Sequence, residues 1–334
     1  MSHRVKVGIG VVVSALGVWL SMRDVRPAEV WEALRHASYA GFAAAMALTI
    51  LAFMIRAIRW RSLLSTPRPV GYDSLFSATM IGFMANNMLP LRLGEFVRAW
   101  ALARREKLSK TTVLATVVVE RVVDMLSLLV ILGIALLVHP IAHSSRAWDL
   151  TRQGAMALVT LSIGLTVFVV FIERKPDLMR VLIARVAARM PERVGEKGVK
   201  ALEHFVEGLG LFRDLSRLLW VFLLSFVMFA VVVVGLQVSM WSLDIHLPWH
   251  AGLTMLVITA IGIMVPAAPG YIGTMNVACV AGLALFSVGK ASAVPFSWFY
   301  WASQWIPVTL VGLLYLRREG LSLRRLGEAE EVAG

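Results

Sequence analysis

The chain alternates between long apolar runs and short stretches that carry most of its charges. A helix of about 20 apolar residues matches a hydrocarbon core of about 30 Å, so runs of this length are typical of membrane spans. Six runs meet this criterion: 5–22, 40–58, 111–138, 154–172, 218–243 and 294–316. The pattern predicts an all-α integral membrane protein with a single polytopic domain over residues 1–334 and about six transmembrane helices.

Two further runs, 75–89 and 251–265, are too short to span, since each gives only about 22 Å of helix. Both lead into helix breakers, which are Pro90 and Gly94 after the first run and Pro266, Pro269, Gly270 and Gly273 after the second. Short segments with such interruptions in both halves of a chain indicate broken helices that meet near the middle of the bilayer. We therefore predict two oppositely oriented re-entrant helical hairpins, arranged as an inverted repeat.

The distribution of Lys and Arg supports this topology. With the N-terminus in the cytoplasm and both hairpins returning to their own side, most positive residues fall in cytoplasmic segments. If the run 75–89 crossed the bilayer fully, most of the Lys and Arg residues would instead fall outside the cytoplasm. The charges say less about the second hairpin, whose prediction depends on its length and its breakers. We expect a multi-pass protein of the bacterial cytoplasmic (inner) membrane with both termini cytoplasmic.

Composition agrees with this class, since 58% of the residues are hydrophobic and only 16% are charged. A net charge of +12 would suggest nucleic acid as the partner of a soluble chain, but topology explains it here, and we expect no nucleic-acid partner. One cysteine excludes a disulfide framework within the chain. Residues 173–217 are predicted to form a cytoplasmic amphipathic helical connector, either on the lipid surface or against the bundle, and residues 317–334 a short cytoplasmic tail.

Ionisable residues interrupt the apolar run 111–138. Glu120 and Asp124 would share one helix face, where they repel each other unless a cation such as Arg121 lies nearby. Glu120 would lie about 15 Å from the start of the helix, which is the middle of the bilayer. Intramembrane charges usually mark ion or substrate sites, which is the functional interpretation. The alternative is a buried ion-pair network that only fixes helix packing.

The first predicted hairpin carries Asn87, Arg92, Glu95 and Arg98. Guanidinium groups suit phosphate or carboxylate, so both arginines are candidate ligands for an anionic head group. Alternatively, they extend to the cytoplasmic head-group layer. Glu95 either holds an arginine in place or carries a proton.

The second predicted hairpin continues through Gly270, Tyr271, Gly273, Thr274 and Asn276. The free N–H groups at the start of its returning helix would form an anion site, which glycines let a ligand approach closely. The candidate substrate-binding residues are therefore Asn87, Arg92, Arg98, Arg121, Gly270, Tyr271, Gly273, Thr274 and Asn276, and the candidate proton or ion-pair residues are Glu95, Glu120 and Asp124.

Other polar and aromatic residues have more ordinary interpretations. Gln237, Ser303 and Gln304 are typical of hydrogen bonds between membrane helices. Five tryptophans are typical of an outer interfacial belt: Trp241, Trp249, Trp298, Trp301 and Trp305.

Three motifs carry a resemblance to a known family. They are Asn87-x-x-Pro90-x-Arg92-x-Gly94-Glu95-x-x-Arg98, Glu120-Arg121-x-x-Asp124 and Pro266-x-x-Pro269-Gly270-x-x-Gly273. In this order and spacing they resemble the transmembrane region of the lysylphosphatidylglycerol synthase family, also called the flippase-like domain family, over nearly the whole chain. The resemblance implies an integral membrane domain that moves lipids or lipid-linked head groups between leaflets.

Two departures limit what the resemblance implies. Bifunctional members carry a cytoplasmic aminoacyl transferase after the membrane domain, but this sequence ends soon after its last predicted span, so we do not expect that activity. Many relatives have an acidic residue near the position of Asn276, which is neutral here, so no proton role is carried over to it.

Two function classes follow. The first is a lipid flippase in which a phosphate head group docks on Arg92, Arg98 and the helix start at 270–276. Its partners would be membrane lipids, either an anionic phospholipid or a polyprenyl phosphate, with homo-oligomer formation left open. The second is a membrane-embedded lipid-phosphate-binding enzyme, or an accessory subunit of a lipid or cell-envelope transferase. The sequence has no HExxH, no Ser/His/Asp set and no phosphate-binding loop, so we expect no metal and no cofactor, and favour the flippase.

Overall fold

The computed structural model describes residues 3–64, 69–89, 93–138, 214–265 and 268–322, with a few single residues between 153 and 167. The described part is helical and contains no strand. Three of its helices are long and apolar enough to cross a membrane, namely α3 (Tyr39–Leu63), α6 (Lys110–Val138) and α10 (Leu215–Trp241). The predicted all-α class is confirmed for the described residues, and the three long apolar helices are consistent with a membrane protein.

The helix lengths repeat in the two halves of the chain. The first unit contains α3, α4 (Tyr72–Met88), α5 (Gly94–Glu106) and α6, with 25, 17, 13 and 29 residues. The second unit contains α10, α11 (His250–Met264), α12 (Thr274–Ala284) and α13 (Lys290–Arg318), with 27, 15, 11 and 29 residues. In each unit, two short helices that pack against each other follow one long helix and precede another.

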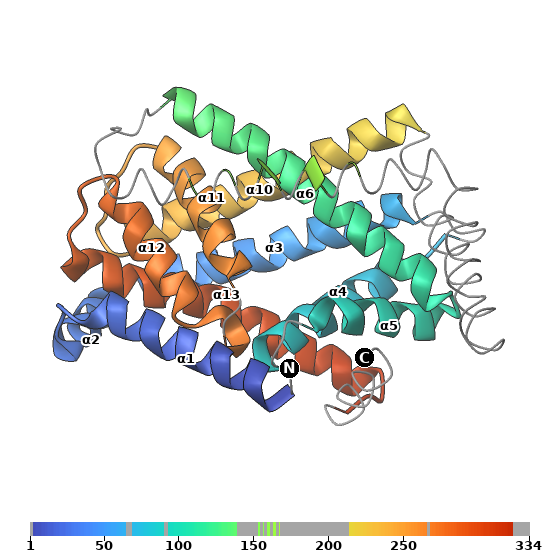
Figure 1. The fold of residues 1–334 in the computed structure, drawn as a ribbon, viewed down its shortest axis with the longest axis horizontal. Helices are drawn as coiled ribbons and strands as arrows, with labels where there is room; N and C mark the ends of the chain where they lie inside the picture. Colours follow the sequence, from blue (N-terminus) through green and yellow to red (C-terminus); the bar gives the residue numbers. More distant parts are fainter. Residues whose placement is uncertain are drawn as a thin grey trace.

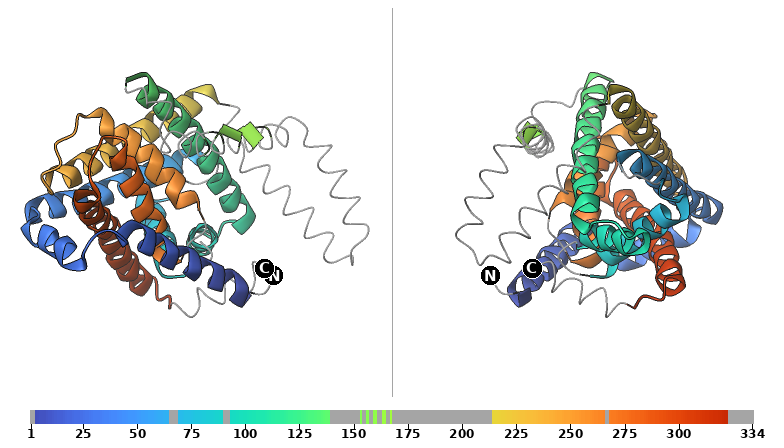
Figure 2. Two further views of the ribbon diagram at one scale, coloured as in Figure 1. Left: turned by 60° about the vertical axis from the view of Figure 1, so that its left-hand side comes forward. Right: turned by 90° about the vertical axis from the view of Figure 1, so that its right-hand side faces the viewer.

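The two units pack together mainly through α3, which lies along α10 and also contacts α13 (Figure 1 and Figure 2). One buried apolar cluster surrounds Trp60 and Leu63 and includes residues of α4, α5 and α6. A second surrounds Met228 and Phe296 and includes residues of α11 and α12. Each pair of short helices therefore packs into a core of its own.

In the first pair, two residues fix how α5 begins beside α4. The Oδ1 atom of Asn86 accepts a hydrogen bond of 2.8 Å from the backbone N–H of Gly94, which satisfies one of the free donors at the start of α5. A Cβ atom on Gly82 would lie 2.5 Å from the Cβ of Arg98 and 2.7 Å from the carbonyl oxygen of Gly94. The helices can approach this closely only because Gly82 has no side chain.

The second pair is built in a similar way. A short 3-10 helix, η3 (Pro269–Tyr271), separates α11 from α12, and positive φ angles occur at Gly270 (74°) and Gly273 (86°), a conformation that favours glycine. The N–H of Gly273 donates to Oδ1 of Asn276 at 3.1 Å. A Cβ atom on Gly262 would lie 2.4 Å from that of Ala278, so a glycine again permits the close helix contact.

The N-terminal helices α1 (His3–Met22) and α2 (Pro27–His36) lie beside the second unit (Figure 1). The Ser14 hydroxyl accepts a hydrogen bond of 2.8 Å from the N–H of Ala268, which joins α1 to the segment before η3. The ammonium group of Lys290 pairs with Asp24, and this hydrogen bond lowers the pKa of the exposed Asp24 carboxyl. Both contacts hold α1 and the turn after it against the second unit.

Several predicted segments lie largely outside the described residues. These are the run 154–172, the connector 173–217 apart from residues 214–217, and the tail beyond residue 322. Residues 214–217 begin α10, where the Asp214 side chain accepts a hydrogen bond of 3.1 Å from the N–H of Arg217.

The contact at Gly82 can be tested by adding one methyl group. Gly82→Ala should lower the free energy of unfolding by about 1 to 3 kcal/mol, because the methyl would overlap Arg98 and the backbone of α5. Thermal unfolding of the purified protein in detergent measures the change. The matched control is Gly133→Ala on α6, where nothing lies within 4 Å of the added Cβ. A Gly82→Ala protein as stable as the control would contradict the proposed close contact.

Candidate functional site

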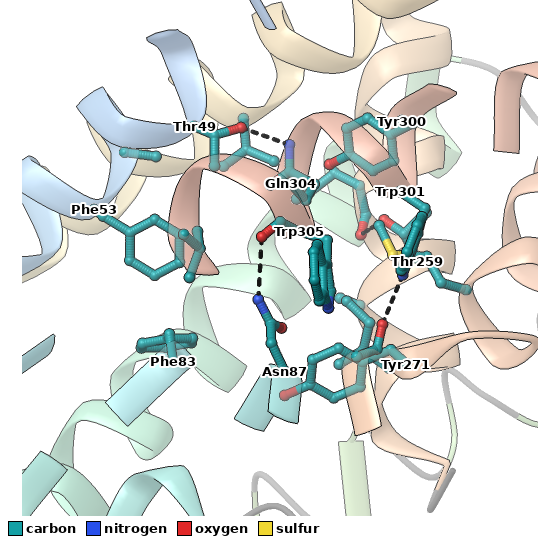
Figure 3. A pocket seen from close by; sticks show the side chains of 18 of the residues that line it. Thr49, Phe53, Phe83, Asn87, Thr259, Tyr271, Tyr300, Trp301, Gln304 and Trp305 are labelled. Carbon is teal, nitrogen blue, oxygen red and sulfur yellow. Dashed lines mark hydrogen bonds between the residues drawn. The ribbon is translucent and has the colours of Figure 1, made fainter. Parts of the chain in front are cut away.

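A cavity of about 240 Å³ lies between the two units (Figure 3). The helices α3, α4, α10, α11, α12 and α13 line it together with η3. Its aromatic residues are Phe53, Phe83, Phe229, Tyr271, Tyr300, Trp301 and Trp305, and its polar side chains include those of Thr49, Arg56, Asn87, Thr259 and Gln304. The cavity is mostly apolar with a few polar groups, which is typical of small-molecule sites.

The end of α4 and the η3 segment meet at this cavity. Asn87, at the end of α4, donates hydrogen bonds to the Thr309 hydroxyl at 3.0 Å and to the Trp305 carbonyl at 3.5 Å. A Cβ atom on Gly270 would lie 3.5 Å from the carbonyl oxygen of Asn87 and 2.9 Å from Nε1 of Trp305. Gly270 therefore allows the interrupted segment of the second unit to lie directly against that of the first.

Hydrogen bonds also fix other polar groups on the cavity wall. The Gln304 amide donates to the Thr49 hydroxyl at 2.8 Å, and Trp301 Nε1 donates to the carbonyl of Gly270 at 2.8 Å (Figure 3). The rings of Trp301 and Trp305 are stacked with centroids 5.6 Å apart. These contacts hold the side chains in defined orientations on the cavity wall.

Next to the cavity, α6 carries two buried carboxylates that pair with arginines of α3. Arg56 Nη1 lies 2.7 Å from Glu120 Oε1 and 3.2 Å from Asp124 Oδ2. Arg59 Nη1 lies 2.5 Å from Asp124 Oδ1 and donates to the Ser225 hydroxyl of α10 at 2.6 Å. The carboxylates thus connect α6 with α3, and Arg59 extends the network to α10.

Two more arginines reach the same carboxylates. Arg98 of α5 forms two hydrogen bonds to Glu120 and stacks on the ring of Trp60, with its guanidinium carbon 3.9 Å from the ring centroid. Arg121 lies 2.6 Å from Glu120 and 3.3 Å from Asp124. Glu95 lies 3.8 Å from both Arg98 and Arg121. We call these seven residues the ionic cluster: Arg56, Arg59, Glu95, Arg98, Glu120, Arg121 and Asp124.

The charges of the ionic cluster do not balance. Within the described part of the chain it contains four guanidinium groups and three carboxylates, which leaves one excess positive charge. Arg59, Arg98 and Glu120 have side chains that are 0% exposed, whereas that of Arg56 is 14% exposed. Arg56 is also the one member of the cluster that lines the cavity. The net-positive ionic cluster therefore borders the cavity at Arg56.

The structure divides the residues predicted from the sequence into three groups. Asn87, Gly270 and Tyr271 line the cavity, and the five ionisable residues Glu95, Arg98, Glu120, Arg121 and Asp124 come together in the ionic cluster. The prediction that Glu120 and Asp124 have cationic partners agrees with these contacts. Arg92, Pro90 and Pro266 lie outside the described residues.

The third group, Gly273, Thr274 and Asn276, does not line the cavity. A Cβ atom on Gly273 would lie 2.3 Å from the carbonyl oxygen of Ser14, so this glycine contacts α1. Thr274 donates to the Tyr271 carbonyl at 3.3 Å, and the amide of Asn276 donates to the Ser297 hydroxyl at 2.9 Å. In this conformation all three form contacts within the protein.

Several residues of the site were missed from the sequence. Arg56 and Arg59 had been counted only as topology charges, yet their spacing of three places them on one helix face, which was a usable signal. Gln304 of α13 donates to Thr49 of α3, which agrees with its predicted role in contacts between helices, and it also lines the cavity. Trp301 and Trp305, predicted to belong to an interfacial belt, line the cavity as well. Their spacing at 301, 304 and 305 also places them on one helix face.

Comparison with known proteins first relates the chain to two archaeal membrane proteins. It is 25% identical over 292 residues to the UPF0104 membrane protein PH1989 of Pyrococcus horikoshii, a match that covers 83% of this chain and 87% of the relative. It is 25% identical over 301 residues to a UPF0104 membrane protein of Methanothermobacter thermautotrophicus, with 83% and 84% covered. No solved structure matches the chain significantly.

A shorter stretch is similar to the glycosyltransferase AglD of Haloferax volcanii, with 30% identity over 140 residues. This match covers 41% of the present chain and only 22% of the length of AglD. A family match extends much further, because the family described as the lysylphosphatidylglycerol synthase TM region matches residues 7–312. The chain therefore belongs to the family of the lysylphosphatidylglycerol synthase TM region.

Proposed function

We propose that this protein moves a lipid with an anionic or lipid-linked phosphate head group between the two leaflets of a membrane, through the cavity between its two units. The observation that carries the proposal is the position of Arg56, a guanidinium group of the net-positive ionic cluster that lies on the cavity wall. Family membership supports a lipid-related role in a membrane.

The proposed membrane arrangement follows from the helix lengths. Helices α1, α3, α6, α10 and α13 and the run 154–172 would span the bilayer. The 17 residues of α4 and the 15 of α11 are too few for a core of about 30 Å, so each would enter and return with its neighbour, α4–α5 from the cytoplasm and α11–α12 from outside. The distribution of Lys and Arg supports a cytoplasmic-membrane protein with both termini in the cytoplasm.

Arg56 has the chemistry that a phosphate site needs. Its guanidinium group offers several planar donors, and its charge acts in a wall that is mostly aromatic and aliphatic, where electrostatic attraction is stronger than in water. Glu120 and Asp124 hold this group in place without neutralising the whole cluster. A lipid phosphate would supply the missing negative charge.

The meeting of Asn87 and Gly270 suggests how access could alternate. These residues belong to the two interrupted segments, and both line the cavity. If each segment moves with its own hairpin, small displacements there would open the cavity toward one leaflet while the other stays closed. Alternating access of this kind lets a polar head group cross without exposure to the hydrocarbon core.

A second candidate function is an enzyme or accessory subunit that holds a lipid phosphate for a transferase. The similarity of one stretch to a protein named glycosyltransferase favours keeping this candidate. The same cavity would then present the lipid for chemical change, and Arg56 would hold the phosphate. Unlike transport, this function yields a modified lipid.

Replacement of Arg56 tests the transport proposal. The full-length protein is reconstituted into phosphatidylcholine liposomes that contain fluorescent phosphatidylglycerol or a fluorescent polyprenyl phosphate, and transfer between leaflets is followed by chemical quenching of the outer leaflet. Arg56→Gln should slow transfer by about tenfold or more, because a charge-assisted hydrogen bond to phosphate is lost. Arg56→Lys keeps the charge and should give an intermediate rate.

The matched control is Arg61→Gln, on the same helix but exposed and outside the cavity, which should transfer lipid at the wild-type rate. Equal rates for Arg56→Gln and the control would remove Arg56 from the mechanism. Absence of transfer by the wild type with both probes would contradict transport. A chemically modified lipid recovered from the liposomes would favour the enzyme candidate.

Glu120 is expected to hold the ionic cluster together. Glu120→Gln should lower the free energy of unfolding by about 3 to 5 kcal/mol, because it leaves buried guanidinium groups without their counter-charge. Thermal unfolding in detergent measures the loss. Glu32→Gln is the control, since the exposed pairs of Glu32 with Arg35 and His36 should contribute at most about 1 kcal/mol. Similar unfolding temperatures for the two variants would refute this role of Glu120.

A further inference from the structure

The cavity has two chemically different ends. Thr49, Phe53 and Arg56 lie along one face of α3 and all line the cavity. Arg56 comes seven positions after Thr49, which is about 10 Å along the helix axis. Arg56 therefore marks a subsite that binds an anion. The end of the cavity near Thr49 lies about the length of one ring and one phosphate away from Arg56.

Aromatic rings form opposite walls between these ends. Figure 3 shows Phe53 and Phe83 on one side of the space and Trp301 and Trp305 on the other. The two indole rings are stacked, with an angle of 26° between their planes, so each holds the other in position on this wall. Arg56 also packs on Phe83, with its guanidinium carbon 5.2 Å from the ring centroid. A ligand held at Arg56 would thus extend between aromatic faces.

Polar groups on the same walls point to a ligand with hydroxyl groups. Trp305 Nε1 has no hydrogen-bond partner within the described part of the chain, and Gln304 uses its amide nitrogen on Thr49 but leaves its carbonyl oxygen without a partner there. An acyl chain in this space would leave these groups unpaired, at a cost in free energy. A phosphate alone would occupy only the end at Arg56.

A sugar ring would fit both the aromatic walls and the polar groups that lack a partner. Its C–H face stacks on aromatic rings, while its hydroxyl groups form hydrogen bonds with amides and indole N–H groups at the ring edge. The cavity volume of about 240 Å³ has room for about one ring and its phosphate.

We propose that the cavity selects a lipid whose phosphate carries a single sugar. The phosphate binds Arg56, the sugar ring lies between the aromatic walls, and its hydroxyl groups bond to Gln304 and Trp305. This inference rests on the proposed function and specifies its substrate class.

Binding and transfer are measured separately to test it. The probes are a short-chain prenyl phosphate and the same compound with glucose, mannose or N-acetylglucosamine on its phosphate. Affinities are measured by tryptophan fluorescence with the full-length protein in phosphatidylcholine nanodiscs. At least one glycosylated probe should bind about tenfold more tightly than the plain phosphate, as expected from added hydrogen bonds and stacking.

Gln304→Leu should reduce this preference to about threefold or less. The matched control is Gln237→Leu, which replaces a buried glutamine of α10 that bonds to the Leu247 carbonyl at 2.9 Å and does not line the cavity, and should keep the full preference. Thermal unfolding verifies that each variant is folded. If Gln304→Leu does not fold, Trp305→Phe, which keeps an aromatic ring but removes the N–H group, takes its place.

The outcomes separate this inference from transport. Equal affinities for plain and glycosylated probes, or a preference that neither Gln304→Leu nor Trp305→Phe reduces, would overturn the sugar site. Transfer of lipid between leaflets in liposomes without any preference for the glycosylated probe would also overturn it while leaving transport intact. Preferential binding that the variants reduce, without transfer, would support the sugar site and contradict the transport proposal.

Discussion

The fold of the first unit depends on one buried carboxylate. Glu120 of α6 contacts the guanidinium groups of Arg56, Arg59 and Arg98 and of its neighbour Arg121, so it joins α6 to α3 and α5. An isolated carboxylate in this environment would carry a large desolvation cost, and isolated arginines would too. Each partner therefore needs the others, and the three helices can pack in this way only while the cluster is complete.

The second unit is held differently, and this difference shapes the cavity. The interrupted segments of both units are fixed by amide and backbone contacts, such as those of Asn86 with Gly94 and of Asn276 with Ser297, but among the described residues it is the first unit that adds the ionic cluster. The cavity lies between the first unit, with its ionic cluster, and the second unit. The first unit supplies its positive charge through Arg56, while α13 of the second unit supplies Trp301 and Trp305. Two units with the same order of long and short helices thus give the two ends of one cavity unlike chemistry.

The sequence predicted the parts of this arrangement that local rules control. Run lengths and breakers gave the short helices α4 and α11, and the spacing of Glu120 and Asp124 gave their shared face. It did not identify Arg56, because an arginine near the end of an apolar run usually extends to the head groups, and only tertiary contacts show that this one turns inward. Asn276 stays a predicted ligand that no contact here tests: it bonds to Gly273 and Ser297 in this conformation, and a polar residue at a helix start has both capping and ligand-binding uses.

Arg56 belongs both to the ionic cluster and to the cavity wall, and it therefore connects the cavity to the packing of α5. Arg56 pairs with Glu120 while it lines the cavity, and Arg98 of α5 pairs with the same Glu120. A phosphate that binds Arg56 competes with Glu120 and Asp124 for its donors, so binding would change the balance of charges around Arg98. Under the proposed function, head-group binding and the position of the α4–α5 hairpin are then linked through one carboxylate. Such a link is what a transporter needs, because a ligand shifts a conformational equilibrium only by interacting differently with its two states.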